Sequence, residues 1–337
     1  MHITSEITDQ KWDEYVKSHP FGNIFQTTSM FNVYRNTKGY FPIKVCAVNE
    51  VTNEIDGVLL GVTIHEMTGL LGKGFLGKFS TRSIIQGGPL VSDNSIVTLS
   101  KMILEYDQKV QNNSLYNQIW NLNDNKKLLQ NMKYYKYEGH LNFLIKLDQP
   151  EETLWLKIHK SKRKNINRML KKGVIIEEIK NKKKIPVFYE LLKETYSRVK
   201  VPLADITLFA SAFDQLVPKN MARFFLAKYD DAYIGGRAIL TYNDLIYDWY
   251  AAASNNALSM HPNECLVWHI LKWGMDNNYK LFDFGGAGKP GMQYGPREFK
   301  REFGGDMVNY GRYTHIYSPL KMKFTDIGLK LYQKSPL

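Results

Sequence analysis

The sequence predicts a mixed α/β protein of the α+β type, with two tandem domains whose mixed sheets are flanked by helices. Three observations lead to this prediction. A chain of 337 residues is longer than one hydrophobic core usually serves. The middle of each half is rich in apolar runs typical of strands, which disfavours a regular alternation of strand and helix. The order of predicted elements in residues 1–147 recurs in residues 174–317, although no residue-level repeat accompanies it.

The first half opens with helices and continues with paired strands. Asp9 is a suitable cap for the first helix, and a polar turn at Asp56-Gly57 joins the first two long strands. The predicted elements are a helix carrying Trp12, Tyr15 and Val16, a helix at 29–35, strands at 41–48 and 58–64, a helix at 95–110, a strand at 115–122, a short helix around 128–129 and a strand at 141–147. We therefore expect the N-terminal domain to cover residues 1–150.

The second half begins with one long helix and then repeats this order. Gly173 ends that helix and Pro262 opens a later one, because glycine suits a helix C-terminus and proline a first turn. The predicted elements are helices at 154–172, 185–198 and 207–216, strands at 174–179, 224–229, 233–242 and 245–252, a helix at 262–275, a strand at 281–284, a short helix after Pro296 and a strand at 308–317. We place the C-terminal domain at residues 151–320, followed by a helix or tail at residues 321–337.

Positive charge is concentrated in one segment. The chain carries a net charge of +12, and residues 157–184 contain twelve lysines and arginines against two glutamates. On the predicted helix, basic residues recur at three- and four-residue steps and form a stripe that suits a phosphate backbone. A solvated surface helix is the other interpretation. The candidate polyanion-binding residues are Lys160, Arg163, Lys164, Arg168 and Lys171.

Several classes of protein and site are disfavoured. Cys46 and Cys265 lie far apart in apolar runs, so neither a disulfide framework nor a cysteine zinc site is expected, and the histidines show no metal spacing. Residues 72–78 fit a phosphate loop, but Phe79 replaces the Ser or Thr that binds magnesium. No signal peptide and no apolar segment of membrane-spanning length are seen, so a cytoplasmic location is expected.

The segment of residues 281–305 is the candidate active site. A buried strand ends there at Asp283 and runs into a loop with five glycines, where backbone groups are exposed to a ligand. The loop fits the dinucleotide pattern, but Pro290 and Pro296 prevent the long helix that should hold a pyrophosphate. A short helix then presents Arg297, Phe299 and Lys300.

Several blocks of sequence resemble the FemA/FemB/FemX group, the peptidoglycan interpeptide-bridge aminoacyltransferases. The blocks are the basic helix SKRKNINR with Gly173, YDWYAAA at residues 247–253, Pro262-Asn263, FDFGG at residues 282–286 and FKREFGG at residues 299–305. The resemblance implies two tandem GNAT-like acyltransferase domains and no metal or bound cofactor. It further implies transfer of an amino acid from aminoacyl-tRNA to an amine of a peptidoglycan precursor.

The resemblance assigns roles by position. Phe299 and Lys300 match the aromatic-lysine pair of the family's active site, and Tyr250 matches a tyrosine that contacts the acceptor. Residues 30–34 and 201–209 lack the lysine, arginine and tyrosine of members that use a nucleotide-linked precursor. The acceptor is therefore left open between a lipid-linked precursor and another amine. Residues 173–222 show no heptad pattern, so the coiled-coil arm of larger members is not expected.

The expected chemistry is direct attack of a neutral amine on the donor ester. Lys300 is the candidate for neutralising the oxyanion or a nearby phosphate, with help from the amides of Gly285 and Gly286. Phe299 excludes water, and Asp283 orients the amine or accepts its proton, unless it is a structural cap. The candidate substrate-binding residues are Tyr247, Tyr250, Gly285, Gly286 and Arg297.

Two rival functions remain. One is an acyl-CoA-dependent N-acyltransferase acting on an amino sugar or amino acid, although neither half contains the usual pyrophosphate loop before a helix. The other is a non-catalytic protein that binds RNA or a membrane. The terminal helix has an apolar and a basic face, which fits peripheral contact with the inner face of an anionic membrane as well as packing on the domain.

Overall fold

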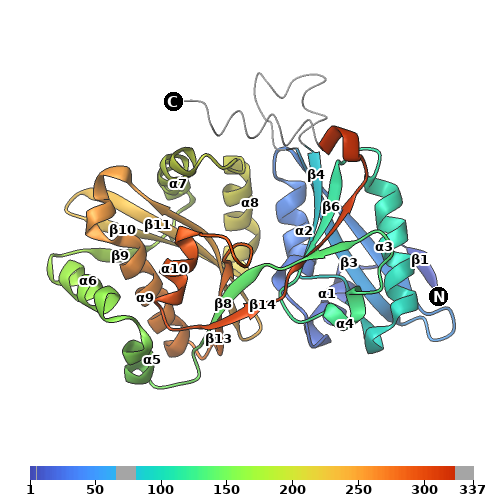
Figure 1. Ribbon diagram of the computed structural model, residues 1–337, viewed down its shortest axis with the longest axis horizontal. Coiled ribbons are helices and arrows are strands. Elements are labelled where there is room, and N and C mark those ends of the chain that lie inside the picture. Colours follow the sequence, from blue (N-terminus) through green and yellow to red (C-terminus); the bar gives the residue numbers. More distant parts are fainter. Residues whose placement is uncertain (5, 66–80, 323–337) are drawn as a thin grey trace. The chain divides into compact units, whose positions relative to one another are not determined.

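The computed structural model describes residues 1–4, 6–65 and 81–322, and Figure 1 shows its elements. The chain forms two compact units. Unit 1 contains residues 1–139 and the segment from Tyr310 onward, and unit 2 contains residues 140–309. Each unit is a mixed sheet flanked by helices, which confirms the predicted fold class. The predicted loop at residues 69–79, with its phosphate-loop pattern, and most of the predicted terminal helix lie outside the described residues.

Unit 1 is built on a sheet in which one neighbouring pair is parallel, namely β4 with β6. The strand order is β1 (His2–Thr4), β2 (Tyr40–Val48), β3 (Ile55–His65), β4 (Thr81–Gln86), β6 (Tyr116–Trp120), β15 (Arg312–Ile316) and β7 (Lys136–Glu138), with β5 (Leu90–Val91) beside β3. The helices are α1 (Asp9–Ser18), α2 (Thr28–Arg35), α3 (Ile96–Val110) and α4 (Lys126–Leu129). Tyr106 of α3 reaches Ser83 of β4 with a hydroxyl–hydroxyl distance of 2.7 Å in the core of this unit.

Unit 2 has the same plan, again with one parallel pair, β12 with β13. The strand order is β14 (Asp306–Asn309), β8 (Leu141–Lys146), β13 (Leu281–Gly286), β12 (Leu245–Ala253), β11 (Ala232–Tyr242), β10 (Ala222–Tyr229) and β9 (Ile175–Glu178). The helices are α5 (Glu151–Lys157), α6 (Lys160–Lys171), α7 (Ile185–Val199), α8 (Ile206–Leu216), α9 (Pro262–Asp276) and α10 (Gly295–Arg301). The two units therefore share the arrangement that the sequence predicts.

Two adjacent glycines of β11 show which helices cover which face of the unit 2 sheet. A side chain at Gly235 would meet Pro262 of α9 at 2.7 Å, and one at Gly236 would meet Phe188 of α7 at 2.6 Å. Successive residues of a strand point to opposite faces. Consequently α9 and α7 pack on opposite faces, and both approach β11 so closely that only glycine fits.

The sheet of each unit contains one strand from the other half of the sequence. β8 follows unit 1 in the chain but pairs with β13 and β14 of unit 2, and β15 follows unit 2 but pairs with β6 and β7. The units therefore divide at residues 139/140 and 309/310 rather than at the predicted 150 and 320. An apolar strand shows in its sequence that it is buried, but not which sheet receives it.

Two predicted elements are each divided in the structure. The helix expected at residues 154–172 is broken into α5 and α6 because Ile158 and His159 are extended, and the His159 ring accepts a hydrogen bond from the Ser161 N–H. The strand expected at residues 308–317 separates into β14 and β15 at Gly311, whose φ is +69°. In the described ranges, no helix combines the length and apolar character needed to cross a bilayer.

Gly304 gives a test of the packing behind α10. Its φ is +78°, and an added Cβ would lie 2.5 Å from the Lys157 carbonyl oxygen. We expect Gly304→Ala to lower the free energy of unfolding by about 2–4 kcal/mol, since neither the strain nor the clash is easily relieved. Urea denaturation measures this, with Gly295→Ala as the control because its Cβ would meet nothing within 4 Å. Equal loss in both variants would contradict the clash.

Candidate active site

The centre of unit 2 contains an opening between its two parallel strands. β12 and β13 pair through only three positions, the last being Tyr247 with Asp283, although both strands continue further. At the same level β12 has a bulge, because Ala238 pairs with Tyr250 and Ile239 with Asp248. A bulge beside the end of a ladder re-aims side chains and is a frequent feature of active sites. Of the predicted site residues, Tyr247, Tyr250 and Asp283 lie at the end of this ladder or at the bulge beside it.

The bulge places two consecutive aromatic residues on the α7/α8 face. The rings of Trp249 and Tyr250 lie 5.9 and 4.8 Å from the ring of Phe209 in α8. Tyr250 also lies 6.0 Å from the ring of Tyr196 in α7 and is half-buried. Tyr250, the predicted acceptor contact, is thus held in an aromatic cluster on one side of the opening.

Asp283 lies at the last paired position before the strands separate and is 1% exposed. Its Oδ1 accepts hydrogen bonds from the side-chain amide of Asn142 and from the N–H of Gly285, both at 2.6 Å. Burial raises the pKa of Asp283 to about 6, and these two donors oppose the rise. The Gly285 N–H therefore already has a partner within the protein, and its role in binding an oxyanion stays a prediction. Tyr247 lies close by, since its hydroxyl would be 3.2 Å from a Cβ on Gly285.

Lys300 reaches from α10 to the end of β13. Its ammonium donates to the carbonyl oxygens of Phe284 at 2.6 Å and Gly286 at 2.8 Å. Burial lowers the pKa of Lys300 to about 8, and the nearby Asp248 carboxylate opposes this shift. The lysine thus fixes the turn where the strands separate, and Gly286 takes part through its carbonyl oxygen. A buried lysine that titrates near neutral pH is typical of functional sites.

Phe299 and Arg297 lie on the same helix as Lys300 but have different surroundings. Phe299 is half-buried, 5.2 Å from the ring of Phe303, with the Lys162 ammonium 4.5 Å from its own ring centre. The Arg297 guanidinium donates to the carbonyl oxygens of Ala287, Met292 and Lys289. All three guanidinium nitrogens therefore bind the glycine loop, and the predicted substrate contact of Arg297 stays a prediction.

The structure adds a buried ion pair that the sequence did not single out. Arg237 of β11 donates to Asp248 of β12 at 2.6 Å and to Asn263 of α9 at 3.3 Å, and both charged side chains are less than one-tenth exposed. Among the described residues, nothing donates to the second Asp248 oxygen. Burial raises the pKa of Asp248, and Arg237 and Lys300 oppose the rise. The sequence feature that could have indicated this ion pair is Asp248 itself, a charged residue between Tyr247 and Trp249 on an apolar strand.

The basic stripe lies on α6 as predicted. Lys160, Lys164, Arg168 and Lys171 are exposed, and Arg163 is half-buried. The opposite face of α6 contributes Ile166 and Met169 to the core. The five predicted polyanion-binding residues therefore share one helix, and four of them are exposed. Their role as a binding site stays a prediction.

Comparison with known proteins shows what this chain is similar to. Residues 157–301 match the family described as an acetyltransferase (GNAT) domain. The chain is 22% identical over 377 aligned positions to a lipid II:glycine glycyltransferase of Staphylococcus haemolyticus, with 88% of each chain covered. It is 20% identical over 411 positions to the protein of that name from Staphylococcus epidermidis, with 97% of this chain and 98% of that one covered. The crystal structure of FemX superimposes with a TM-score of 0.71 at 18% identity, covering 96% of this chain and 100% of the other.

These matches agree with the geometry of the site. The GNAT match begins just before α6 and ends with α10, so it contains the strand opening and Lys300. The relatives and the FemX structure extend the likeness over both units. The predicted likeness to the FemA/FemB/FemX group is therefore confirmed, and the chain is an acyltransferase with two GNAT-like units.

Proposed function

We propose that the protein is an aminoacyltransferase that moves an amino acid from aminoacyl-tRNA to an amine of a lipid-linked peptidoglycan precursor. One observation carries the proposal: the exposed basic stripe of α6 and the Lys300–Asp283 site belong to the same unit of a FemX-like fold. The stripe fits a polyanionic donor, and the site fits acyl transfer. No metal or bound cofactor is part of this proposal.

The donor is argued from the stripe. From Lys160 to Lys171 the helix rises about 16 Å, at roughly 1.5 Å per residue, which brings its cations within reach of several phosphates. Exposed cations that neutralise phosphates bind through release of counterions. A small acyl donor needs no such extended surface, so the stripe favours a donor carried on tRNA.

The acceptor is argued from the relatives and from two segments of this chain. The matched staphylococcal proteins are named lipid II:glycine glycyltransferases. In α2, Met30, Val33 and Tyr34 are buried, and in α8 so are Leu208 and Phe209. These segments thus contribute buried apolar side chains to the core. Members of the family that use a nucleotide-linked precursor have cationic and hydroxyl groups in the same segments. A lipid-linked precursor is therefore the acceptor we favour.

The proposed reaction forms an amide bond and breaks an ester bond. The acceptor amine attacks the carbonyl carbon of the aminoacyl ester, and its excess proton passes to a base. The ester oxygen of the tRNA then leaves as the carbonyl reforms, and it takes up that proton from the base to become the free hydroxyl. Asp283 is the proposed base, because a carboxyl with a pKa of about 6 is ionised at neutral pH and still basic enough to accept a proton.

Lys300 and Phe299 have separate roles in this mechanism. The Lys300 ammonium places positive charge where the oxyanion develops, inside a buried site where charge acts strongly. Phe299 shields the ester from water, which would otherwise hydrolyse it. Tyr247 and Tyr250 line the opening on which the acceptor is proposed to lie.

Acyl-CoA is the alternative donor, and the GNAT family match favours it. The chain around the start of α9 opposes it. The connection at residues 254–261 has no glycine, and Pro262 at the first turn has no N–H to offer a pyrophosphate.

A parallel donor assay distinguishes these functions. Purified protein is offered a set of charged tRNAs and a set of acyl-CoAs, each with a lipid-linked precursor, and the products are searched for a new amide by mass spectrometry. Amide from charged tRNA supports the proposal, and amide from acyl-CoA alone overturns it. RNA binding without any amide favours the non-catalytic alternative.

The basic stripe makes a separate prediction about donor binding. Replacing Lys160, Lys164, Arg168 and Lys171 together by glutamine is expected to weaken tRNA binding at least about 100-fold and to flatten the plot of log K against log salt by about 3. Titration at several salt concentrations measures both effects. The matched control replaces Lys11, Lys17, Lys101 and Lys109 of unit 1. Equal loss in the two variants would show that binding depends on net charge alone.

A further inference from the structure

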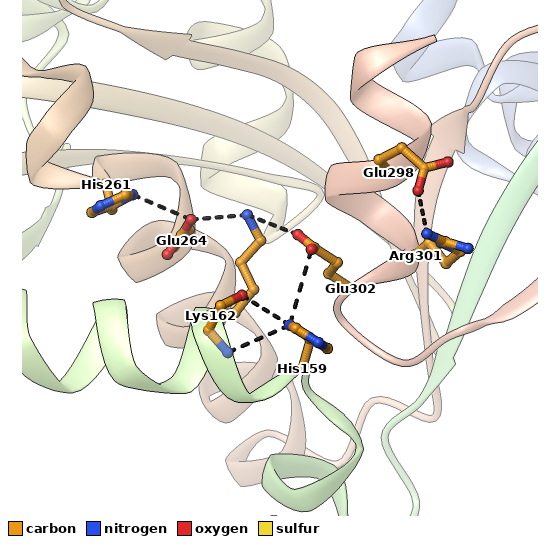
Figure 2. A network of polar contacts seen from close by, with 8 residues as sticks. His159, Lys162, His261, Glu264, Glu298, Arg301 and Glu302 are labelled. Carbon is orange, nitrogen blue, oxygen red and sulfur yellow. Dashed lines mark hydrogen bonds and ion pairs between the residues drawn. The ribbon is translucent and has the colours of Figure 1, made fainter. Parts of the chain in front are cut away.

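Lys162 differs from the other basic residues of α6 because its side chain points into unit 2. The ammonium forms ion pairs with Glu264 at 2.8 Å and with Glu302 at 3.2 Å, and the side chain is 11% exposed. Figure 2 shows it at the centre of a network of polar contacts that includes His159 and His261. Its neighbours Lys160 and Lys164 are exposed. Lys162 is therefore unavailable for the exposed stripe.

The contacts of Lys162 join three elements of the site. Glu264 lies in the first turn of α9, and Glu302 directly follows α10. The same ammonium lies 4.5 Å from the ring centre of Phe299 in α10. The backbone N–H of His159 also donates to the Glu302 carbonyl oxygen at 2.8 Å, which ties the start of α6 to the end of α10.

The burial of this network argues for a positional role. Glu264 is 5% exposed, and nothing among the described residues donates a hydrogen bond to its Oε2. Apolar side chains of similar volume usually stabilise a protein as well as a buried ion pair does, so stability alone is a poor reason for such a pair. Directional contacts from one ammonium to two carboxylates and a ring restrain α6, α9 and α10 relative to one another.

We infer that Lys162 is a positioning residue for acyl transfer, which holds Phe299 in the place where it excludes water from the donor ester. This inference rests on the proposed function, because water exclusion matters only if an activated ester is bound. Without the ammonium, the Phe299 ring loses its partner on one face and the end of α10 loses Glu302 as an anchor. Water then competes with the acceptor amine.

The test compares hydrolysis of the donor with transfer to the acceptor. Lys162→Met alone leaves Glu264 buried without its cation and risks misfolding, so Lys162→Met/Glu264→Gln is the working variant. Lys162→Arg is the conservative variant, because a guanidinium reaches both carboxylates and stacks on a ring. Lys193→Met is the matched control, since Lys193 pairs with Glu190 and lies 5.9 Å from the Tyr189 ring, but on the exposed side of α7.

The expected result is a ratio of hydrolysis to transfer about tenfold higher in the double variant. The ratio should stay near that of the wild type in Lys162→Arg and Lys193→Met. Adding Phe299→Leu to the double variant should raise the ratio little further, because both changes remove the same barrier. An unchanged ratio in a folded double variant, or full additivity with Phe299→Leu, would overturn the inference.

This test uses the donor that gives amide in the parallel assay, either charged tRNA or acyl-CoA. The test can therefore be carried out even if one of the two donors gives no amide. If the wild type forms no amide with either, the proposed function fails. Hydrogen exchange of the α10 amides then decides on Lys162 by itself. We expect exchange at residues 297–303 to be at least tenfold faster in the double variant and unchanged in Lys162→Arg. Equal exchange in all variants would refute the positioning role.

Discussion

Lys300→Met is expected to lower kcat/KM for amide formation by about 100-fold or more, the usual effect of removing the main group that stabilises an oxyanion. Methionine keeps most of the length and apolar stem of lysine, so the loss isolates the ammonium. The ammonium is the only part of the side chain that bonds the carbonyl oxygens of Phe284 and Gly286. Steady-state kinetics with the selected donor measures the effect.

The control for this variant is Arg301→Met on the same helix. Arg301 is two-thirds exposed and pairs with Glu298 at the surface, so its loss should change kcat/KM less than about threefold. Lys300→Met also leaves two carbonyl groups without their donor, so circular dichroism and thermal unfolding must show a folded protein. Near-normal turnover in folded Lys300→Met would remove Lys300 from the mechanism.

The pH dependence of kcat/KM is expected to have two limbs, near pH 6 and near pH 8. Burial raises the pKa of Asp283 to about 6, so below that pH the carboxyl is protonated and cannot accept the proton of the amine. Burial lowers the pKa of Lys300 to about 8, so above that pH the ammonium is lost. The rate should therefore rise through pH 6 and fall through pH 8, by about tenfold per pH unit outside these limbs.

Two variants assign the limbs. Asp283→Asn should abolish the limb near pH 6 and lower the plateau by 10²-fold or more, because an amide is not a base. Lys300→Arg should move the upper limb beyond pH 10, because arginine stays protonated. This shift is expected even if the substitution lowers kcat/KM. A limb near pH 8 that persists in folded Lys300→Arg would belong to another group.

The charged forms of Lys300 and Asp283 both lower the free energy of unfolding at neutral pH. The folded pKa of Lys300 lies below its ordinary value, so stability falls as pH drops from about 10.5 to about 8. The folded pKa of Asp283 lies above its ordinary value, so stability falls as pH rises from about 4 to about 6. Charged forms that are disfavoured by folding and yet retained are typical of functional sites.

The sequence alone determined the fold class, the exposed basic stripe and the segment that carries Phe299, Lys300 and Asp283. These features are local, since apolar periodicity, glycine and proline positions and runs of charge act over a few residues. The hydrogen bonds of Gly285 and Arg297 are also local, since their partners lie 2 to 10 residues away. They depend on the conformation of the glycine loop, which the residue pattern alone does not define.

Only the tertiary structure decided which distant residues meet. Asn142 bonds Asp283, which lies 141 positions later, and Arg237 of β11 bonds Asp248 of β12. Strand β8, from the first half of the sequence, joins the sheet of unit 2, and β15, from the second half, joins the sheet of unit 1. Lys162 also points into the core of unit 2, and the sequence of its helix does not distinguish it from the exposed lysines. Such contacts depend on which buried faces pack together, and a periodic pattern shows that a face is buried without naming its partner.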